Sequence, residues 1–174
     1  ASFVYPTDFI LIAAMNPCPC GYYGDLKREC TCTDGEIRRY NRKISGPLLD
    51  RIDLHISVQR PKYSELTSAI KAESSKEVAI RVQKAREIQK ERLKKWGMQC
   101  NSQMRHKQLR ETCTLDKEGS EMLRYVFEQM QLSARSYDHI IKVARTIADL
   151  DESENIDSSH IAEAISYRRR MAGR

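Results

Sequence analysis

The sequence lacks several features that would assign it to a common class of protein. No lysine is followed by serine or threonine, so the GxxxxGK[ST] loop that cradles nucleotide phosphates is missing from these 174 residues. The longest apolar run, 9–15, is far too short to cross a bilayer, and no basic segment precedes it as in a signal peptide. We therefore expect a cytoplasmic chain that does not enter a membrane.

Charged residues are plentiful. They make up 31% of the chain, with a net charge of +6 and a pI near 9.0. A basic balance is compatible with a polyanion partner such as DNA, but many soluble domains are mildly basic without binding one. Charge alone therefore leaves contact with nucleic acid open.

Four of the six cysteines fall close together, as two C-x-C pairs separated by nine residues: Cys18, Cys20, Cys30 and Cys32. Without an export signal, such a cluster favours metal or reduced thiols over disulfides. Four thiolates suit a tetrahedral, structural zinc ion, although the spacing is tighter than the common C-x₂-C. Zinc is our prediction, with free thiols or disulfides as the alternatives, and Cys100 and Cys113 are expected to be ordinary residues.

The order of patterns predicts a mainly α chain in two parts. Residues 1–61 contain two strand candidates, the continuous apolar run 9–15 and the segment 53–58, around a turn-rich, cysteine-rich insertion at 16–46. Two strands cannot form a stable parallel sheet, so this part resembles the remnant of a larger α/β core. From residue 62 to 174 the periodicity becomes helical and favours a bundle.

Sequence signals predict where these helices begin. Ser74 and Glu77 form a capping box before a long charged helix that ends near Gly97. Further helices are expected at about 116–130, after the N-cap Ser133, and from about Asp157. The inward face of the first is predicted to contain Val78, Val82, Ala85, Ile88 and Leu93.

Three polar residues stand where ligands are bound in other proteins. Asn16 ends the first apolar segment, at the edge where α/β sheets bind ligands, although it could simply begin a turn with Pro17. Arg51 lies between two acids, which is also the pattern of a surface salt bridge. Arg135 follows a helix start, where the helix dipole disfavours a cation unless an anion is bound there.

Taken in order, four stretches resemble one family. IAAMNPCPCG at 12–21, SGPLLDRIDL at 45–54, LSAR at 132–135 and KVARTIADL at 142–150 are similar to the magnesium-chelatase-like AAA+ ATPases of the ComM type. The resemblance covers nearly the whole chain. It implies a helical AAA+ lid bundle preceded by the end of the α/β ATPase core.

The resemblance also implies roles for the three residues. Asn16 would be sensor 1, Arg51 an arginine finger that reaches a neighbouring subunit's site, and Arg135 sensor 2, which contacts nucleotide phosphates from the lid. The intact protein would use ATP and Mg²⁺ and assemble into a hexameric ring that remodels DNA. In this family the phosphate loop and the paired acids for magnesium lie upstream of the matching stretch, so the chain alone is expected not to hydrolyse ATP.

Two other functions stay open at this stage. A chelatase-type motor would drive metal insertion into a tetrapyrrole, but the chelatase subunits lack the paired C-x-C insertion. A stand-alone zinc-bearing DNA-binding module would bind DNA in a salt-dependent way without nucleotide or ring assembly.

Overall fold

The structure is a computed structural model of the chain, and it describes residues 3, 5, 9–25, 27–58, 60, 61, 63, 67 and 72–168. It divides into two compact units, Ala1–Leu49 and Asp50–Arg174, which are described separately below. The sequence places the domain boundary at 61/62 instead, and residue 62 lies outside the described residues. The units divide earlier because the residues just after Leu49 bind to the second unit.

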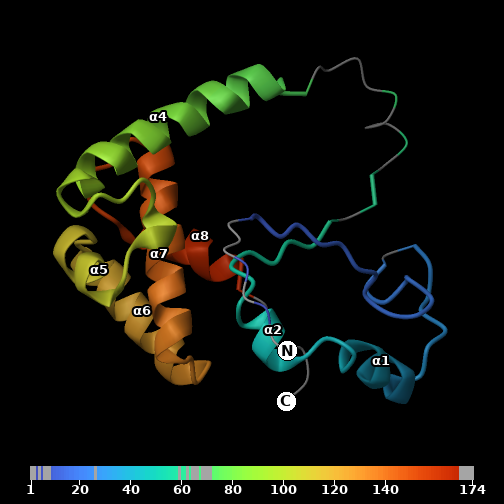
Figure 1. Cartoon of the computed structure of the whole chain (residues 1–174). Coiled ribbons are helices and arrows are strands. Elements are labelled where there is room, and N and C mark those ends of the chain that lie inside the picture. The colour runs from blue at the N-terminus through green and yellow to red at the C-terminus, as the bar shows by residue number, and fades with distance from the viewer. Residues whose placement is uncertain are drawn as a thin grey trace. The chain divides into compact units, whose positions relative to one another are not determined.

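The described residues of the first unit contain helices α1 (Asp34–Asn41) and α2 (Gly46–Leu49) (Figure 1). Helix α1 starts after Thr33 because a capping box satisfies its first backbone N–H groups. The Thr33 side chain accepts from the N–H of Glu36, and the Glu36 carboxylate accepts from the N–H of Thr33 at 2.8 Å. The cysteine-rich stretch before α1 forms turns without regular structure.

The second unit is helical. Its elements are α4 (Ser75–Leu93), the 3₁₀ turns η1 (Lys94–Trp96) and η2 (Asn101–Gln103), α5 (His106–Thr112), α6 (Lys117–Gln129), α7 (Ala134–Leu150) and α8 (Ser158–Ser166). Helix α7 contacts α4, α5, α8 and η2, so it is the central element of the unit (Figure 1). The expectation of a mainly α chain is confirmed.

The predicted helix starts are confirmed by their caps. Ser74 forms the capping box with Glu77, and the side chains of Asp116, Ser133 and Asp157 each accept backbone N–H groups at the start of α6, α7 and α8. Each cap satisfies donors that the helix itself cannot, which is worth about 1 kcal/mol of stability. The start of each of these helices could therefore be predicted from one polar residue.

One face of α7 forms the centre of the hydrophobic core. Its buried side chains recur at helical spacing, and other elements pack buried aliphatic side chains against them. The core contains Leu93, Met104, Leu109, Leu123, Ile140, Ile141, Ala144, Ile147, Ala148, Ile156, Ile161 and Ala164. Each fully buried aliphatic side chain contributes about 1.5–3 kcal/mol, so this cluster is the main source of stability in the unit.

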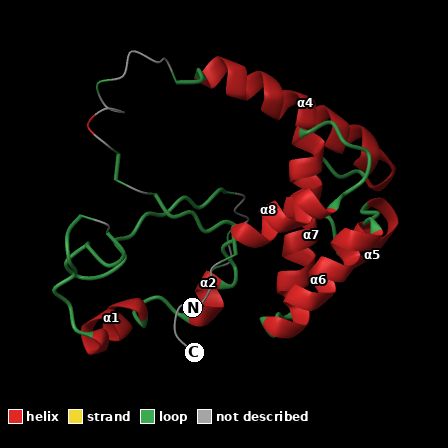
Figure 2. Cartoon of the chain, turned by 180° about the vertical axis from the view of Figure 1, so that it is seen from behind, coloured by secondary structure: helices red, strands yellow, loops and turns green. Residues whose placement is uncertain are grey.

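The two expected strands are not formed in the described part of the chain. Residues 9–15 and 53–58 have irregular backbone, and Figure 2 draws no strand there. The β pairing that the described residues do contain is an isolated bridge between Leu115 and Ile156. A strand requires a neighbour to pair its backbone N–H and C=O groups, and neither segment has one here. The apolar side chains of 9–12 are correspondingly exposed.

The predicted inward face of α4 is correct only in its second half. Ala85 and Leu93 are buried, whereas Val78 and Val82 are exposed. Figure 1 shows the first half of α4 extending beyond the other helices of its unit, so those valines have no helix against which to pack. The periodicity indicated a helix, but it could not show where the neighbouring helices end.

A buried ionic network lies beside this core. The Asp149 carboxylate accepts hydrogen bonds from Arg92 at 2.6 and 2.7 Å, from Asn101 at 2.8 Å and from Arg145 at 3.1 Å. The side chains of Asp149 and Arg145 are 0% and 1% exposed. Arg145 also donates to the backbone carbonyls of Ser153 and Glu154, which fixes the loop between α7 and α8.

Within the described residues, no helix combines the length and the apolarity that a membrane span requires.

The network predicts a large stability difference between two acid-to-alanine substitutions. Asp149→Ala leaves the buried Arg145 and the partly buried Arg92 without their carboxylate, and breaking a buried pair in this way costs about 3–5 kcal/mol. Glu91→Ala, which removes an exposed partner of Lys94, should cost less than about 1 kcal/mol. Urea unfolding of the purified chain measures both, and equal small losses would contradict the role given to Asp149.

Candidate functional site

The four clustered cysteines of the sequence meet in space. All four sulfur atoms lie within 4.8 Å of one another, with separations of 3.3 Å for Cys18–Cys20, 3.6 Å for Cys18–Cys30 and 3.5 Å for Cys20–Cys30. They are free thiols, since a disulfide bond would bring two sulfurs to about 2.05 Å. Around a tetrahedral zinc ion with Zn–S bonds of about 2.3 Å, the sulfurs would stand about 3.8 Å apart. The cluster is close to that size.

The sulfur atoms of this cluster change one another's pKa values. The backbone N–H of Tyr22 lowers the pKa of Cys20 to about 5. The backbone of Cys20 acts to lower the pKa of Cys32, but burial and the three neighbouring sulfurs raise it to about 12. One thiolate thus makes the next one harder to form. A divalent cation removes this conflict, because it favours the thiolate at every ligand.

The turn that carries the first two cysteines also contacts Asn16. The N–H of Gly21 donates to the carbonyl of Cys18 at 3.1 Å, and Gly21 adopts φ +83°, a conformation that favours glycine. A Cβ on Gly21 would stand 3.9 Å from Cγ and Nδ2 of Asn16. The amide of Asn16 therefore lies beside the cysteine turn, although the residue is largely exposed.

The two predicted arginines, Arg51 and Arg135, both belong to the second unit, whereas Asn16 belongs to the first. Both arginines are exposed. Arg135 is the second residue of α7, two positions after the cap formed by Ser133. The first turn of α7 contains no acid, so no side chain of that turn neutralises the arginine at the positive end of the helix dipole.

The neighbours of these two arginines bind each other. Ser136 donates a hydrogen bond from Oγ to Oδ1 of Asp50 at 2.9 Å. Arg168 donates to the same Asp50 oxygen at 3.0 Å and to Oγ of Ser136 at 3.2 Å. We call Asp50, Ser136 and Arg168 the clamp. It joins the residue before Arg51 to the residue after Arg135.

Further contacts hold the same segment on the other side of Arg51. Arg168 donates to the carbonyl of Ile52 at 3.4 Å, and the N–H of His55 donates to the carbonyl of Tyr167 at 2.8 Å. Nδ1 of His139 lies 2.6 Å from Oδ1 of Asp53, a close ion-pair approach whose direction falls outside hydrogen-bond geometry. This contact with His139 lowers the pKa of Asp53.

The clamp residues were missed by reasoning from sequence. A basic run such as 168–170 is usually a solvated terminus, but the Arg168 side chain is only 9% exposed, so this interpretation is wrong for that residue. The remaining tail cations, Arg169, Arg170 and Arg174, lie outside the described residues. A signal for Ser136 did exist: it lies four residues before Ile140 on the buried stripe of α7, where a polar side chain needs a partner.

Several basic side chains of α4 and of the adjoining η1 form ion pairs. The pairs are Arg81–Glu73 and Lys84–Glu152 on α4, and Lys94–Glu91 and Lys95–Glu111 at η1. These pairs compensate part of the charge that would otherwise attract a polyanion. This basic surface therefore gives no separate support for a DNA site.

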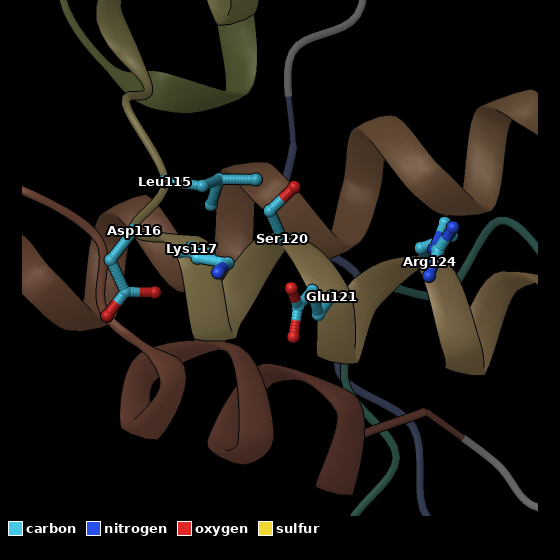
Figure 3. A pocket seen from close by; sticks show the side chains of 6 residues that line it. All are labelled: Leu115, Asp116, Lys117, Ser120, Glu121 and Arg124. Atoms are coloured by element: carbon cyan, nitrogen blue, oxygen red, sulfur yellow. The ribbon is translucent and has the colours of Figure 1, made fainter.

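Figure 3 shows a hollow over the start of α6, lined by Leu115, Asp116, Lys117, Ser120, Glu121 and Arg124. Its acidic and basic side chains are mixed, and Asp116 already accepts the N–H of Gly119 as the cap of α6. None of the predicted site residues lines it. The hollow is therefore not a candidate for the nucleotide or metal site.

Two protein-family models match the chain. Residues 1–66 match the model described as magnesium chelatase, subunit ChlI, and residues 72–168 match the model of the ChlI C-terminal region. Together they cover all the residues predicted here to carry chemistry.

Curated relatives are similar over almost the whole chain. YifB of Escherichia coli K12 is 39% identical over 170 residues, which are 97% of this chain and 32% of the relative. The competence protein ComM of Haemophilus influenzae is 38% identical over 169 residues, again 97% of this chain and 32% of the relative. Rv2897c of Mycobacterium tuberculosis is 34% identical over 170 residues. The chain thus spans about a third of the length of these relatives.

The His139–Asp53 contact predicts a shifted titration. The Asp53 carboxyl should titrate below the usual pKa of aspartate, and His139→Ala should move its pKa back up. A carboxyl with a lowered pKa stabilises the fold at neutral pH, and that contribution is lost as the pH falls through the lowered pKa. Carboxyl NMR follows the titration, with His106→Ala as the control because His106 contacts Asp138 instead. An unchanged Asp53 titration in His139→Ala would contradict the assignment.

Proposed function

Because this chain belongs to the magnesium chelatase ChlI-type family, we propose that it is part of an AAA+ ATPase whose ATP hydrolysis drives DNA remodelling. The remodelling would be branch migration or a helicase-like activity in recombination or natural transformation. The similarity to the competence protein ComM supports this choice within the family. The chain spans a third of that relative, so the activity belongs to the full-length protein.

Each predicted residue has a separate role in this proposal. Asn16 acts as sensor 1 and orients the water that attacks the terminal phosphate of ATP. Arg135 acts as sensor 2 and binds nucleotide phosphates from the helical lid. Arg51 acts as the arginine finger, and its guanidinium offsets the negative charge that develops during phosphoryl transfer. Mg²⁺ bound with ATP neutralises phosphate charge, and its ligands are not among these residues.

The observation that carries the proposal is the hydrogen bond between Asp50 and Ser136. Asp50 precedes Arg51 and Ser136 follows Arg135, so this bond joins the neighbours of two exposed arginines. The two arginines lie 84 positions apart in the sequence. Guanidinium groups bind polyphosphates well, and these two exposed arginines stand on backbone segments that the Asp50–Ser136 bond holds together. A finger also needs a second subunit to act on, and a hexameric ring provides one at every interface.

We propose in addition that Cys18, Cys20, Cys30 and Cys32 bind one structural zinc ion. Among the described residues of the first unit, the buried apolar side chains are Cys18 and Ile37, which is too little for a core of its own. A metal ion supplies the missing stabilisation, as in other small cysteine-rich folds. Four protein ligands leave no open position, so the ion would have no catalytic role.

A chelatase-type motor is the second candidate, because both matching family models are described by the ChlI subunit. The two functions differ in what stimulates ATP hydrolysis by the full-length protein. Branched DNA should raise turnover in the first case, with a strong salt dependence from phosphate contacts. Stimulation by a tetrapyrrole and its metal-inserting partner, without any effect of DNA, would favour the second.

The finger role predicts different kinetic losses for the two arginines. In the full-length protein, Arg51→Ala should leave ATP binding nearly intact and lower turnover by roughly 10³-fold or more, as for other arginine fingers. Arg135→Ala should weaken ATP binding as well, because its guanidinium binds the phosphates in the ground state. Nucleotide affinity and steady-state turnover separate the two effects.

Mixed rings provide the control for action between subunits. Arg51→Ala subunits are combined with subunits that lack the phosphate-loop lysine of the full-length protein. Some interfaces then pair an intact finger with an intact loop, so part of the activity should return. If rings demonstrably mix and no activity returns, Arg51 does not serve a neighbouring site.

The zinc proposal predicts about one zinc ion per chain in protein purified without chelator. Cys20→Ser and Cys32→Ser should each lower the zinc content sharply, because they leave three thiolate ligands. Cys100→Ser is the matched control, since Cys100 lies outside the cluster and should not affect the metal. Zinc content that is unchanged in the two cluster variants would exclude this site.

A further inference from the structure

The segment that carries Arg51 is fixed to the second unit on both sides of the arginine. Asp50, immediately before it, accepts hydrogen bonds from Ser136 and Arg168. Ile52, immediately after it, accepts from the same Arg168 guanidinium through its backbone carbonyl. One buried arginine therefore binds both chain neighbours of Arg51.

Two of the three clamp residues are buried: Ser136 is 2% exposed, and the side chain of Arg168 is 9% exposed. The Asp50 side chain is 41% exposed. A buried guanidinium needs partners for its donors, and here they are one carboxylate, one hydroxyl and one carbonyl. These hydrogen bonds restrain the backbone at residues 50–52.

We propose that Ser136 and Arg168 are positioning residues that hold Arg51 in place and link it to the helix that carries Arg135. This inference rests on the arginine-finger role proposed above. Ser136 directly follows Arg135 in α7, so the clamp attaches the Arg51 backbone to the same helical turn that carries Arg135.

The position of the Arg51 guanidinium matters for the rate of ATP hydrolysis. An arginine finger stabilises charge only when its guanidinium is already in position, since misplacement by about 1 Å can cost about 100-fold in rate. An arginine on an irregular segment such as 50–55 would sample many positions. Attachment to the capped first turn of α7 limits that sampling without using the arginine side chain itself.

The test is a double-mutant cycle for ATP hydrolysis in the full-length protein. Arg168→Ala and Ser136→Ala should each lower kcat by about 10-fold to 100-fold, with KM for ATP nearly unchanged. In an Arg51→Ala background neither change should lower kcat further, because a misplaced finger and a missing finger have the same consequence. Arg168→Lys should restore part of kcat, since an ammonium can still pair with Asp50 but cannot also reach the Ile52 carbonyl.

Arg81→Ala is the matched control, because it removes an exposed arginine of α4 that pairs with Glu73. This variant should leave basal turnover unchanged. Thermal melting and gel filtration verify folding and ring assembly, and Ser136→Ala, which deletes one oxygen, keeps the test available if Arg168→Ala does not fold. Equal losses of kcat in the wild-type and Arg51→Ala backgrounds, or full activity of both clamp variants, would overturn the positioning role alone. Full activity of Arg51→Ala by itself would instead overturn the proposed finger.

Discussion

The buried carboxylate of Asp149 is the group around which the second unit is arranged. It binds Arg92 from α4, Asn101 from η2 and Arg145 from its own helix, and Arg145 in turn holds the loop that leads to α8. An ion in an apolar interior is costly unless all its partners are present. The hydrophobic core supplies most of the stability, and this network links α4, η2 and α7 through one carboxylate.

The same helix connects this network to the candidate site. Helix α7 has 17 residues and is therefore about 25 Å long, with Asp149 near its end and Arg135 and Ser136 in its first turn. Because its last turns are fixed by buried ion pairs, its first turn is a rigid support. The clamp attaches the Arg51 segment to that first turn, so Arg51 and Arg135, which are far apart in the sequence, are both held by the start of α7.

The first unit is organised by a different kind of interaction. Its described residues bury little apolar surface, and the four cysteine sulfurs are its most compact feature. The turn at Gly21 places the amide of Asn16 beside this cluster. Cysteine chemistry would then determine the local position of Asn16, just as helix packing determines the position of Arg51 in the second unit.

The sequence by itself determined the helix starts, the cysteine cluster and the family. Ser74, Asp116, Ser133 and Asp157 cap helices through contacts within about three residues, so local sequence is sufficient to identify them. The C-x-C pairs work in the same way, since each pair brings two sulfur atoms together over one turn.

The clamp, and the irregular backbone of residues 9–15 and 53–58, could be found only from the tertiary structure. Arg168 lies 118 positions from Asp50, and no local pattern distinguishes a buried arginine from a solvated one. The pattern of residues 9–15 predicts a strand, but their backbone is irregular. A strand forms only where another strand pairs with its backbone, and the sequence of the segment does not show whether the fold provides that partner. Contacts between distant residues depend on how the helices pack, and local sequence does not encode that packing.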